Sequence, residues 1–125
     1  MERLNARTNR RKVGREAERA AGEFLEKLGY RLLERNWRCP EGEIDIVAMD
    51  GDILVFVEVR SRTSDRFGTP AESVDERKRR RIRAAARRYL YDTRCFGAYR
   101  IRFDVVAVGG GSDGPLRVEH IVNAF

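Results

Sequence analysis

The spacing of apolar residues divides the chain into segments of two kinds. Between residues 13 and 28, apolar side chains recur every three or four positions, which predicts a helix with one buried face. Gly29 is typical of the position where a helix ends, because glycine readily adopts a left-handed backbone conformation. Residues 1–12 are polar and basic, so we interpret them as an N-terminal tail, with an arm that contacts phosphates as the alternative.

The segment after Gly29 has the patterns of strands. The dipeptide Asp50-Gly51 lies between two strongly apolar runs, and this arrangement is the strongest short-range signal of a β-hairpin. Pro40 and Gly42 punctuate the chain before the first run and indicate a loop there. The sequence therefore predicts strands at 30–35, 43–49 and 52–60, with a loop at 36–42.

The C-terminal half predicts one more helix and two more strands. Ser73 and Glu76 have the spacing of a capping box, so a helix is expected to start there and to run to about Tyr91. Alternating polar and apolar residues predict the remaining strands. These strands are expected at 100–108 and 116–122, with loops at 61–72 and 109–115. The order α, β, β, β, α, β, β indicates one α/β domain over 13–125, with a mixed sheet flanked by helices.

The predicted hairpin gathers acidic side chains on one face. A two-residue turn at Asp50-Gly51 places Glu43 directly opposite Glu58, and Asp45 diagonal to Glu58. Opposed carboxylates destabilise a half-buried sheet, so a compensating cation is expected. A hard divalent cation such as Mg²⁺ would take carboxylate oxygens as ligands. Arg60 on the same face offers a second source of positive charge.

The other face of the hairpin is apolar throughout and is expected to be core. For the acidic face, the alternative interpretation is an ordinary solvent-facing strand end whose carboxylates are neutralised by arginines. The residues assigned to the apolar face are Ile44, Ile46, Ala48, Ile53, Val55, Val57 and Val59.

The net charge says more about the partner of the protein than its length does. Among 125 residues, Lys and Arg number 26 and Asp and Glu number 20, which gives a formal net charge of +6. A basic domain of this size suggests a polyanion as partner, with nucleic acid preferred over an anionic membrane surface. Eight positive residues lie between positions 77 and 88 on the second predicted helix. No motif that reads bases is visible, so recognition of phosphate and shape without sequence specificity is expected.

Scarce residues exclude several kinds of site. One histidine, His120, excludes the H-E-x-x-H metalloprotease motif and nucleases that use several histidines. Cys39 and Cys95 lack C-x-x-C spacing, which excludes a zinc ribbon, and we interpret them as free thiols in a reducing cytosol. No apolar run approaches the roughly 18 residues that a membrane span needs. A cytoplasmic protein without a membrane partner is therefore expected.

Several short motifs together resemble the YraN family of small bacterial proteins. The resemblance covers residues 13–125, and its specificity comes from the combination of motifs. That family is related to archaeal Holliday-junction resolvases and to the restriction-endonuclease-like fold, whose αβββαβ core matches the predicted order of elements. The matching stretches are Gly14–Glu18, Gly42–Asp45, Val55–Arg62, Phe67-Gly68, Lys78, Arg102–Val106 and Asn123–Phe125.

The resemblance implies roles for individual residues. Asp45 and Glu58 would bind the metal ion, and Glu18 on the first helix would support the metal site. Arg60 falls where nucleases of this fold usually carry lysine. Because arginine keeps its proton, Arg60 would position a phosphate rather than act as a general base. Glu43 beside these residues would support the ligands.

The function that the resemblance implies is a Mg²⁺- or Mn²⁺-dependent endonuclease. It would act without sequence specificity on DNA in preference to RNA, on branched or single-stranded forms. A resolvase-like role would favour a homodimer. Two alternatives are a non-catalytic nucleic-acid-binding module with a nuclease fold, motivated by Arg60, and an interaction protein whose arginines dock an acidic partner. The residues expected to contact phosphates are Arg15, Arg62, Lys78, Arg79 and Arg81.

Overall fold

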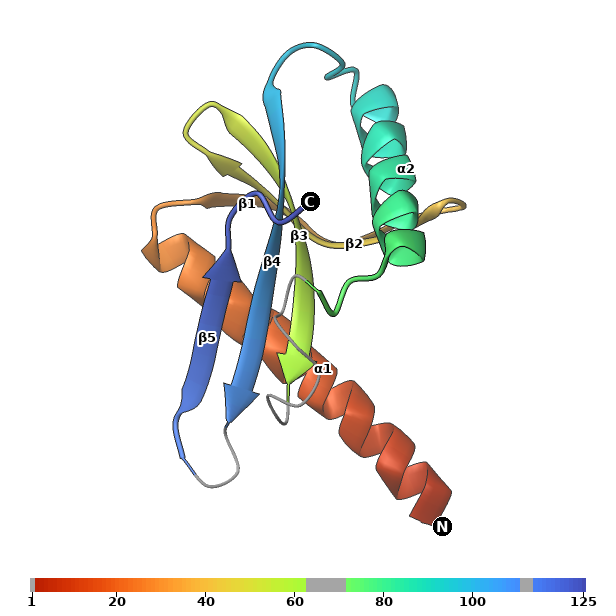
Figure 1. Cartoon of the computed structure of the whole chain (residues 1–125), viewed down its shortest axis with the longest axis vertical. Helices are drawn as coiled ribbons and strands as arrows, with labels where there is room; N and C mark the ends of the chain where they lie inside the picture. The colour runs from red at the N-terminus through yellow and green to blue at the C-terminus, as the bar shows by residue number, and fades with distance from the viewer. Residues whose placement is uncertain (1, 63–71, 111–113) are drawn as a thin grey trace.

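The computed structural model describes residues 2–62, 72–110 and 114–125, with side chains from Gly14 onward except that of Arg62. Five strands form one mixed sheet in the order β1-β2-β3-β4-β5, in which β3 and β4 are parallel and the other neighbours antiparallel. Both the α/β class and the restriction-endonuclease-like αβββαβ order are confirmed (Figure 1). The elements are α1 (Glu2–Lys27), β1 (Arg31–Cys39), β2 (Gly42–Asp50), β3 (Ile53–Arg62), α2 (Glu76–Asp92), β4 (Arg100–Gly110) and β5 (Leu116–Ile121).

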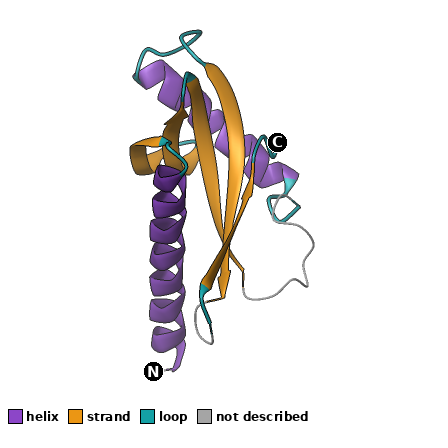
Figure 2. Ribbon diagram, turned by 90° about the vertical axis from the view of Figure 1, so that its left-hand side faces the viewer, coloured by secondary structure: helices purple, strands orange, loops and turns teal. Residues whose placement is uncertain are grey.

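The helix α1 is longer than its apolar pattern predicts. It begins at Glu2, so the backbone of residues 2–12, which we interpreted as a tail, continues the helix (Figure 2). Its end agrees with the prediction. Gly29 has a φ of +95°, and its N–H and that of Tyr30 donate to carbonyls in the last turn of the helix. These two bonds satisfy carbonyl groups that would otherwise lack partners.

The two helices pack on opposite faces of the sheet. On one face, α1 covers the side chains that the hairpin pattern assigned to the core, and Val106 and Val108 of β4 join them. On the other face, α2 covers the apolar residues nearest the hairpin turn. The second face is therefore covered by a helix along most of β2 and β3, and only its far end is polar. The fully buried residues of this second face include Val47, Leu54, Phe56 and Ala85.

The hairpin turn lies one position later than predicted. Gly51 and Asp52 form the turn, Asp50 pairs with Ile53, and Gly51 has a φ of +60° that suits glycine. The register therefore differs by two residues from the predicted one. A shift of two keeps every side chain on its face, so the assignment of faces survives while the directly opposed pairs change.

Strand β1 also extends beyond its predicted end. The segment 36–39, expected as part of a loop, continues the strand to Cys39, with Asn36 at a φ of +51°. As a result Arg38 lies opposite Glu43 on β2. Strands β3 and β4 each continue two residues into the loops predicted at 61–72 and 109–115, and residues 63–71 and 111–113 of those loops lie outside the described residues.

The cysteines and the helices bear on two further predictions. Cys39 and Cys95 are both free thiols, as expected. Within the described part of the chain, neither helix combines the length and the apolar character needed to cross a membrane.

Candidate active site

The candidate site lies where β2 and β3 separate. Their pairing runs from the turn to Ile46 and Val57 and stops there. Beyond this point, the Asp45 carboxylate accepts a hydrogen bond of 2.8 Å from the backbone N–H of Val59. The side chain of β2 thus replaces a ladder bond between the strands, and Asp45 is held in the fork that they form.

The fork changes the alternation of β2. Ile44 was predicted on the same face as Ile46, but it packs with Val47 and Tyr89 on the face covered by α2. Ile46 remains on the α1 face. The assignment of Ile44 was therefore wrong, because the alternation of β2 breaks between Ile44 and Ile46, where β2 parts from β3 while it stays paired with β1.

Glu58 is the buried carboxylate of the site. Its side chain is 5% exposed, and Lys78 Nζ lies 2.8 Å from its Oε1. Arg60, which the sequence placed beside Glu58, is farther away, at 3.9 Å between the nearest nitrogen and the same oxygen. The main positive partner of Glu58 therefore comes from α2 rather than from β3.

The first turn of α2 positions Lys78. Asp75 is the N-cap residue, and its Oδ1 accepts a hydrogen bond of 2.8 Å from the Lys78 backbone N–H. The helix accordingly begins at Glu76, slightly later than the predicted start near Ser73. From the sequence, Lys78 was expected to contact a phosphate or to help at the site, with a surface position as the alternative. The spacing of three residues from a capping aspartate is the signal that fixes Lys78 in the first turn, although it does not identify Glu58 as its partner.

The predicted opposition of Glu43 and Glu58 was wrong. In the observed register, Glu43 lies opposite Arg38 of β1, and Arg38 Nε is 3.6 Å from its carboxylate. Asp45, predicted to be diagonal to Glu58, is the acid that interacts with it most directly. The acidic cluster was thus predicted with the right members but with the wrong pairs.

Asp45 is electrostatically unusual. Burial, followed by the charge of Glu58, raises the pKa of Asp45 to about 8, although the bond from Val59 acts in the opposite direction. The charge of Glu18 on α1 adds to the increase, so the structure places all three predicted acids within electrostatic reach of one another. Two carboxyl groups thus share a buried position where both can ionise only at an energetic cost.

A pocket of about 200 Å³ opens beside these carboxylates. No cluster of three His, Cys, Asp or Glu side chains that could hold a metal ion occurs among the described residues. Asp45 and Glu58 could therefore supply two ligands, and water or substrate oxygens would have to supply the others. Mg²⁺ is commonly bound in this way, through one or two carboxylates. The pocket is lined by Gly42, Glu43, Asp45, Glu58, Lys78, Arg81 and Ile82.

The predicted phosphate-binding residues do not all lie at the pocket. Lys78 and Arg81 line it, whereas Arg15 is exposed on α1. Arg79 donates 2.8 Å to the carbonyl of Val74, and its guanidinium lies over the ring of Phe125. Arg79 therefore fastens the C-terminal residue to α2. The side chain of Arg62 lies outside the described residues.

Comparison with known proteins identifies the family. The family model "Uncharacterised protein family UPF0102" matches residues 17–108. The chain belongs to the UPF0102 family. This is the YraN family, so the resemblance seen in the sequence is confirmed.

Relatives in the UPF0102 family match along most of the chain. A UPF0102 protein of Moorella thermoacetica is 57% identical over 99 residues, which cover 79% of this chain and 82% of the relative. One of Frankia casuarinae is 47% identical over 113 residues, covering 90% and 95%. One of Pseudomonas syringae pv. tomato is 47% identical over 116 residues, covering 88% and 91%. Each aligned segment is about as long as the domain itself.

Proposed function

We propose that this UPF0102 protein is a metal-dependent endonuclease that cleaves DNA without sequence specificity. The observation that carries the proposal is a pair of neighbouring carboxylates, half-buried Asp45 and buried Glu58, in a pocket that Lys78 and Arg81 also line. The charge of Glu58 raises the pKa of Asp45, which costs stability unless a cation joins the two groups, and such groups are typical of functional sites.

The donor set of the pocket fits a hard divalent cation. Asp45 and Glu58 would hold Mg²⁺ or Mn²⁺, and Glu18 would orient a water molecule bound beside them. The ion would supply a Lewis acid for the phosphate and a more acidic water as nucleophile. Asp45 is kept in place by Val59 N–H, so its second oxygen is the one directed to a ligand.

The basic side chains would bind the substrate. Lys78 holds Glu58 and contributes positive charge where a phosphate would enter, and Arg81 lines the same pocket. Because arginine is a poor general base, the role of Arg60 would be to position a phosphate. These contacts involve the backbone of a nucleic acid and no base edge, which supports recognition by shape and charge.

A nuclease assay with matched variants tests this proposal. Single-stranded, duplex, flap and four-way DNA would be incubated with Mn²⁺ or Mg²⁺ and with wild type, Asp45→Asn, Glu58→Gln or the control Asp52→Asn. Asp52 is an exposed acid of the hairpin turn. We expect wild type and the control to cleave, and both site variants to lose at least 100-fold in rate. Cleavage that persists in the site variants would contradict the proposal.

Metal binding provides a second readout that does not depend on cleavage. Isothermal titration with Mn²⁺ should give heat of binding with wild type and Asp52→Asn but not with Asp45→Asn. The alternative function, a non-catalytic binding module, is motivated by Arg60 in place of lysine. It predicts salt-sensitive DNA binding with no Mn²⁺ site and no cleavage of any of the four substrates.

A further inference from the structure

One side of α2 joins the candidate active site to a second pocket. Arg81 lines the first pocket, and Ala84 and Arg88, which lie three and seven positions farther along the helix, line the second. These spacings place the three residues on one face of a helix. The turn between β1 and β2 runs beside this face, since Gly42 lines the first pocket and Glu41 the second (Figure 1).

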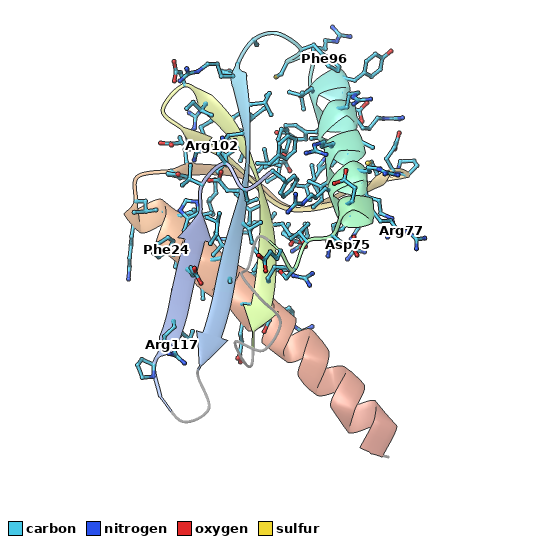
Figure 3. All side chains as sticks on the ribbon, in the orientation of Figure 1. Phe24, Asp75, Arg77, Phe96, Arg102 and Arg117 are labelled. Atoms are coloured by element: carbon cyan, nitrogen blue, oxygen red, sulfur yellow. The ribbon has the colours of Figure 1, made fainter. Side chains whose placement is uncertain are left out.

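The second pocket carries exposed aromatic side chains. It has a volume of about 370 Å³ and is lined by Glu41, Ala84, Arg87, Arg88, Tyr91 and Phe96. Tyr91 is 71% exposed and Phe96 is 57% exposed. Figure 3 shows Phe96 near the end of α2 that is remote from Asp75 and Arg77. Neither aromatic ring belongs to a core cluster among the described residues, so packing in the core does not account for these two side chains.

The charges around the second pocket suit a polyanion. Arg88 is bound to Glu41 and Asp92 and so contributes little free positive charge. Arg81 and Arg87, by contrast, have no acidic side chain within 4 Å among the described residues. Both are exposed. Aromatic rings beside uncompensated arginines are the combination that binds single-stranded nucleic acid, through base stacking and phosphate contacts.

We propose that the side of α2 between the two pockets binds an unpaired strand that continues from the candidate active site. A base would stack on Phe96 and Tyr91, and Arg81 and Arg87 would contact its phosphates. The span of α2 from Lys78 to Tyr91 is roughly 20 Å at about 1.5 Å per residue, long enough for several nucleotides. This inference rests on the proposed function and specifies its substrate class. The preferred DNA would have a single-stranded extension next to the cleavage point, as a flap or fork does.

Binding measured without metal tests the inference separately from cleavage. Fluorescence anisotropy in EDTA would compare a forked DNA with two unpaired arms and a blunt duplex of equal length. We expect Phe96→Ala and Tyr91→Ala each to weaken binding of the fork on the order of 5- to 100-fold, and to leave the blunt duplex unchanged. Phe96→Trp should retain binding, because tryptophan also stacks. Leu28→Ala, at an exposed apolar residue at the end of α1, is the control.

Two further measurements identify the contact. Replacing the bases of each arm one at a time by abasic sites should weaken binding of wild type at one or two positions and have no effect there in Phe96→Ala. Arg87→Gln should lower the slope of log affinity against log salt by about 0.7, the value for one phosphate contact on a single strand, whereas Phe96→Ala should not change it.

Several results would overturn the inference. Equal losses for the fork and the blunt duplex, or no loss in either aromatic variant, would show that no unpaired base binds there. A change from dimer to monomer in Phe96→Ala by sedimentation would show that the patch joins two copies of the chain instead. Fork binding that depends on Phe96 in a protein that never cleaves DNA would support this inference and contradict the nuclease activity.

Discussion

Two aspartates in the same sheet have surroundings that shift their pKa values in opposite directions. Asp104 on β4 is fully buried and accepts four hydrogen bonds, two from Arg102, one from His120 and one from the backbone N–H of Asn123. Asp45 on β2 accepts a bond from the Val59 N–H and has the carboxylate of Glu58 as its neighbour. Asp104 has lost contact with water and is bonded to donors in its place, whereas Asp45 is only half-buried and lies beside another acid.

The pKa values of the two aspartates follow from this difference. Burial alone would raise the pKa of Asp104, yet the hydrogen bonds from His120, Arg102 and Asn123 outweigh it and lower the pKa. At Asp45, burial and the charge of Glu58 act together, and the pKa rises to about 8. Asp104 is thus satisfied by the chain itself. At Asp45 the bond from Val59 does not outweigh burial and the charge of Glu58, which is why we assign a ligand to its pocket.

The largest expected effect comes from a substitution of Asp104, whose carboxylate accepts four hydrogen bonds. Asp104→Asn removes the charge that pairs with Arg102, which is only 13% exposed and also contacts Asp50 and Tyr30. Removing one partner of a buried ion pair typically costs about 3–5 kcal/mol. We expect a loss of this size in the free energy of unfolding, measured by urea denaturation at pH 7. Asp50→Asn, which removes a partly exposed contact of Arg102, should cost far less.

Asp104 also contributes to the decrease of the free energy of unfolding at acid pH. Because its folded pKa is lowered, its contribution is present above the pKa of the unfolded chain and is lost as the pH falls through the lower folded value. Stability of Asp104→Asn should therefore decline less steeply than that of wild type below about pH 4. An unchanged acid limb in the variant would contradict the role assigned to this residue.

The same substitution at the other centre should have the opposite sign. Asp45→Asn removes the repulsion with Glu58 and keeps an oxygen for Val59 N–H, so we expect roughly 1–3 kcal/mol of added stability at pH 8. A raised folded pKa stabilises the fold fully below the unfolded pKa, and this contribution is lost as the pH rises through about 8. Urea denaturation from pH 5 to pH 9 should show a decline in wild type that is flatter in the variant. Destabilisation by Asp45→Asn at pH 8 would contradict this account.

Sequence alone predicted the composition of the acidic site but not its geometry. Apart from that of Ile44, the faces of the hairpin residues were correct, because a period of two is insensitive to a shift of two residues. The partners of Glu43 and Glu58 were not correct, because the turn uses Gly51-Asp52 rather than Asp50-Gly51. The fork in which Asp45 lies is a tertiary feature, and no pattern within the sequence of β2 predicts where its pairing with β3 ends.

The hydrogen-bonded centre at Asp104 was harder to predict from the sequence. Arg102 and Asp104 lie on one strand, where a separation of two residues places them on the same face. His120 and Asn123 reach Asp104 only through the pairing of β4 with β5. Likewise, Lys78 reaches Glu58 only because α2 folds across the sheet. Contacts between distant segments depend on topology, which hydrophobic periodicity constrains only in part.

The smallest expected effect sharpens the comparison by separating the two centres. Asp75→Ala removes the N-cap of α2 and should cost about 1 kcal/mol, a typical value for such a residue. Because Asp75 holds the turn that carries Lys78, the variant should also weaken Mn²⁺ binding at Asp45 and Glu58 by a few-fold, measured by isothermal titration. Among the described residues, the hydrogen-bond partners of Asp104 are Arg102, His120 and Asn123, none of which lies on α2. The acid limb of the stability profile should therefore keep its shape. Asp75→Asn retains the capping oxygen and is the matched control, expected to resemble wild type in both measurements. A change in the acid limb of Asp75→Ala would mean that the two centres are coupled through the sheet, and the contrast between them would then be one of degree.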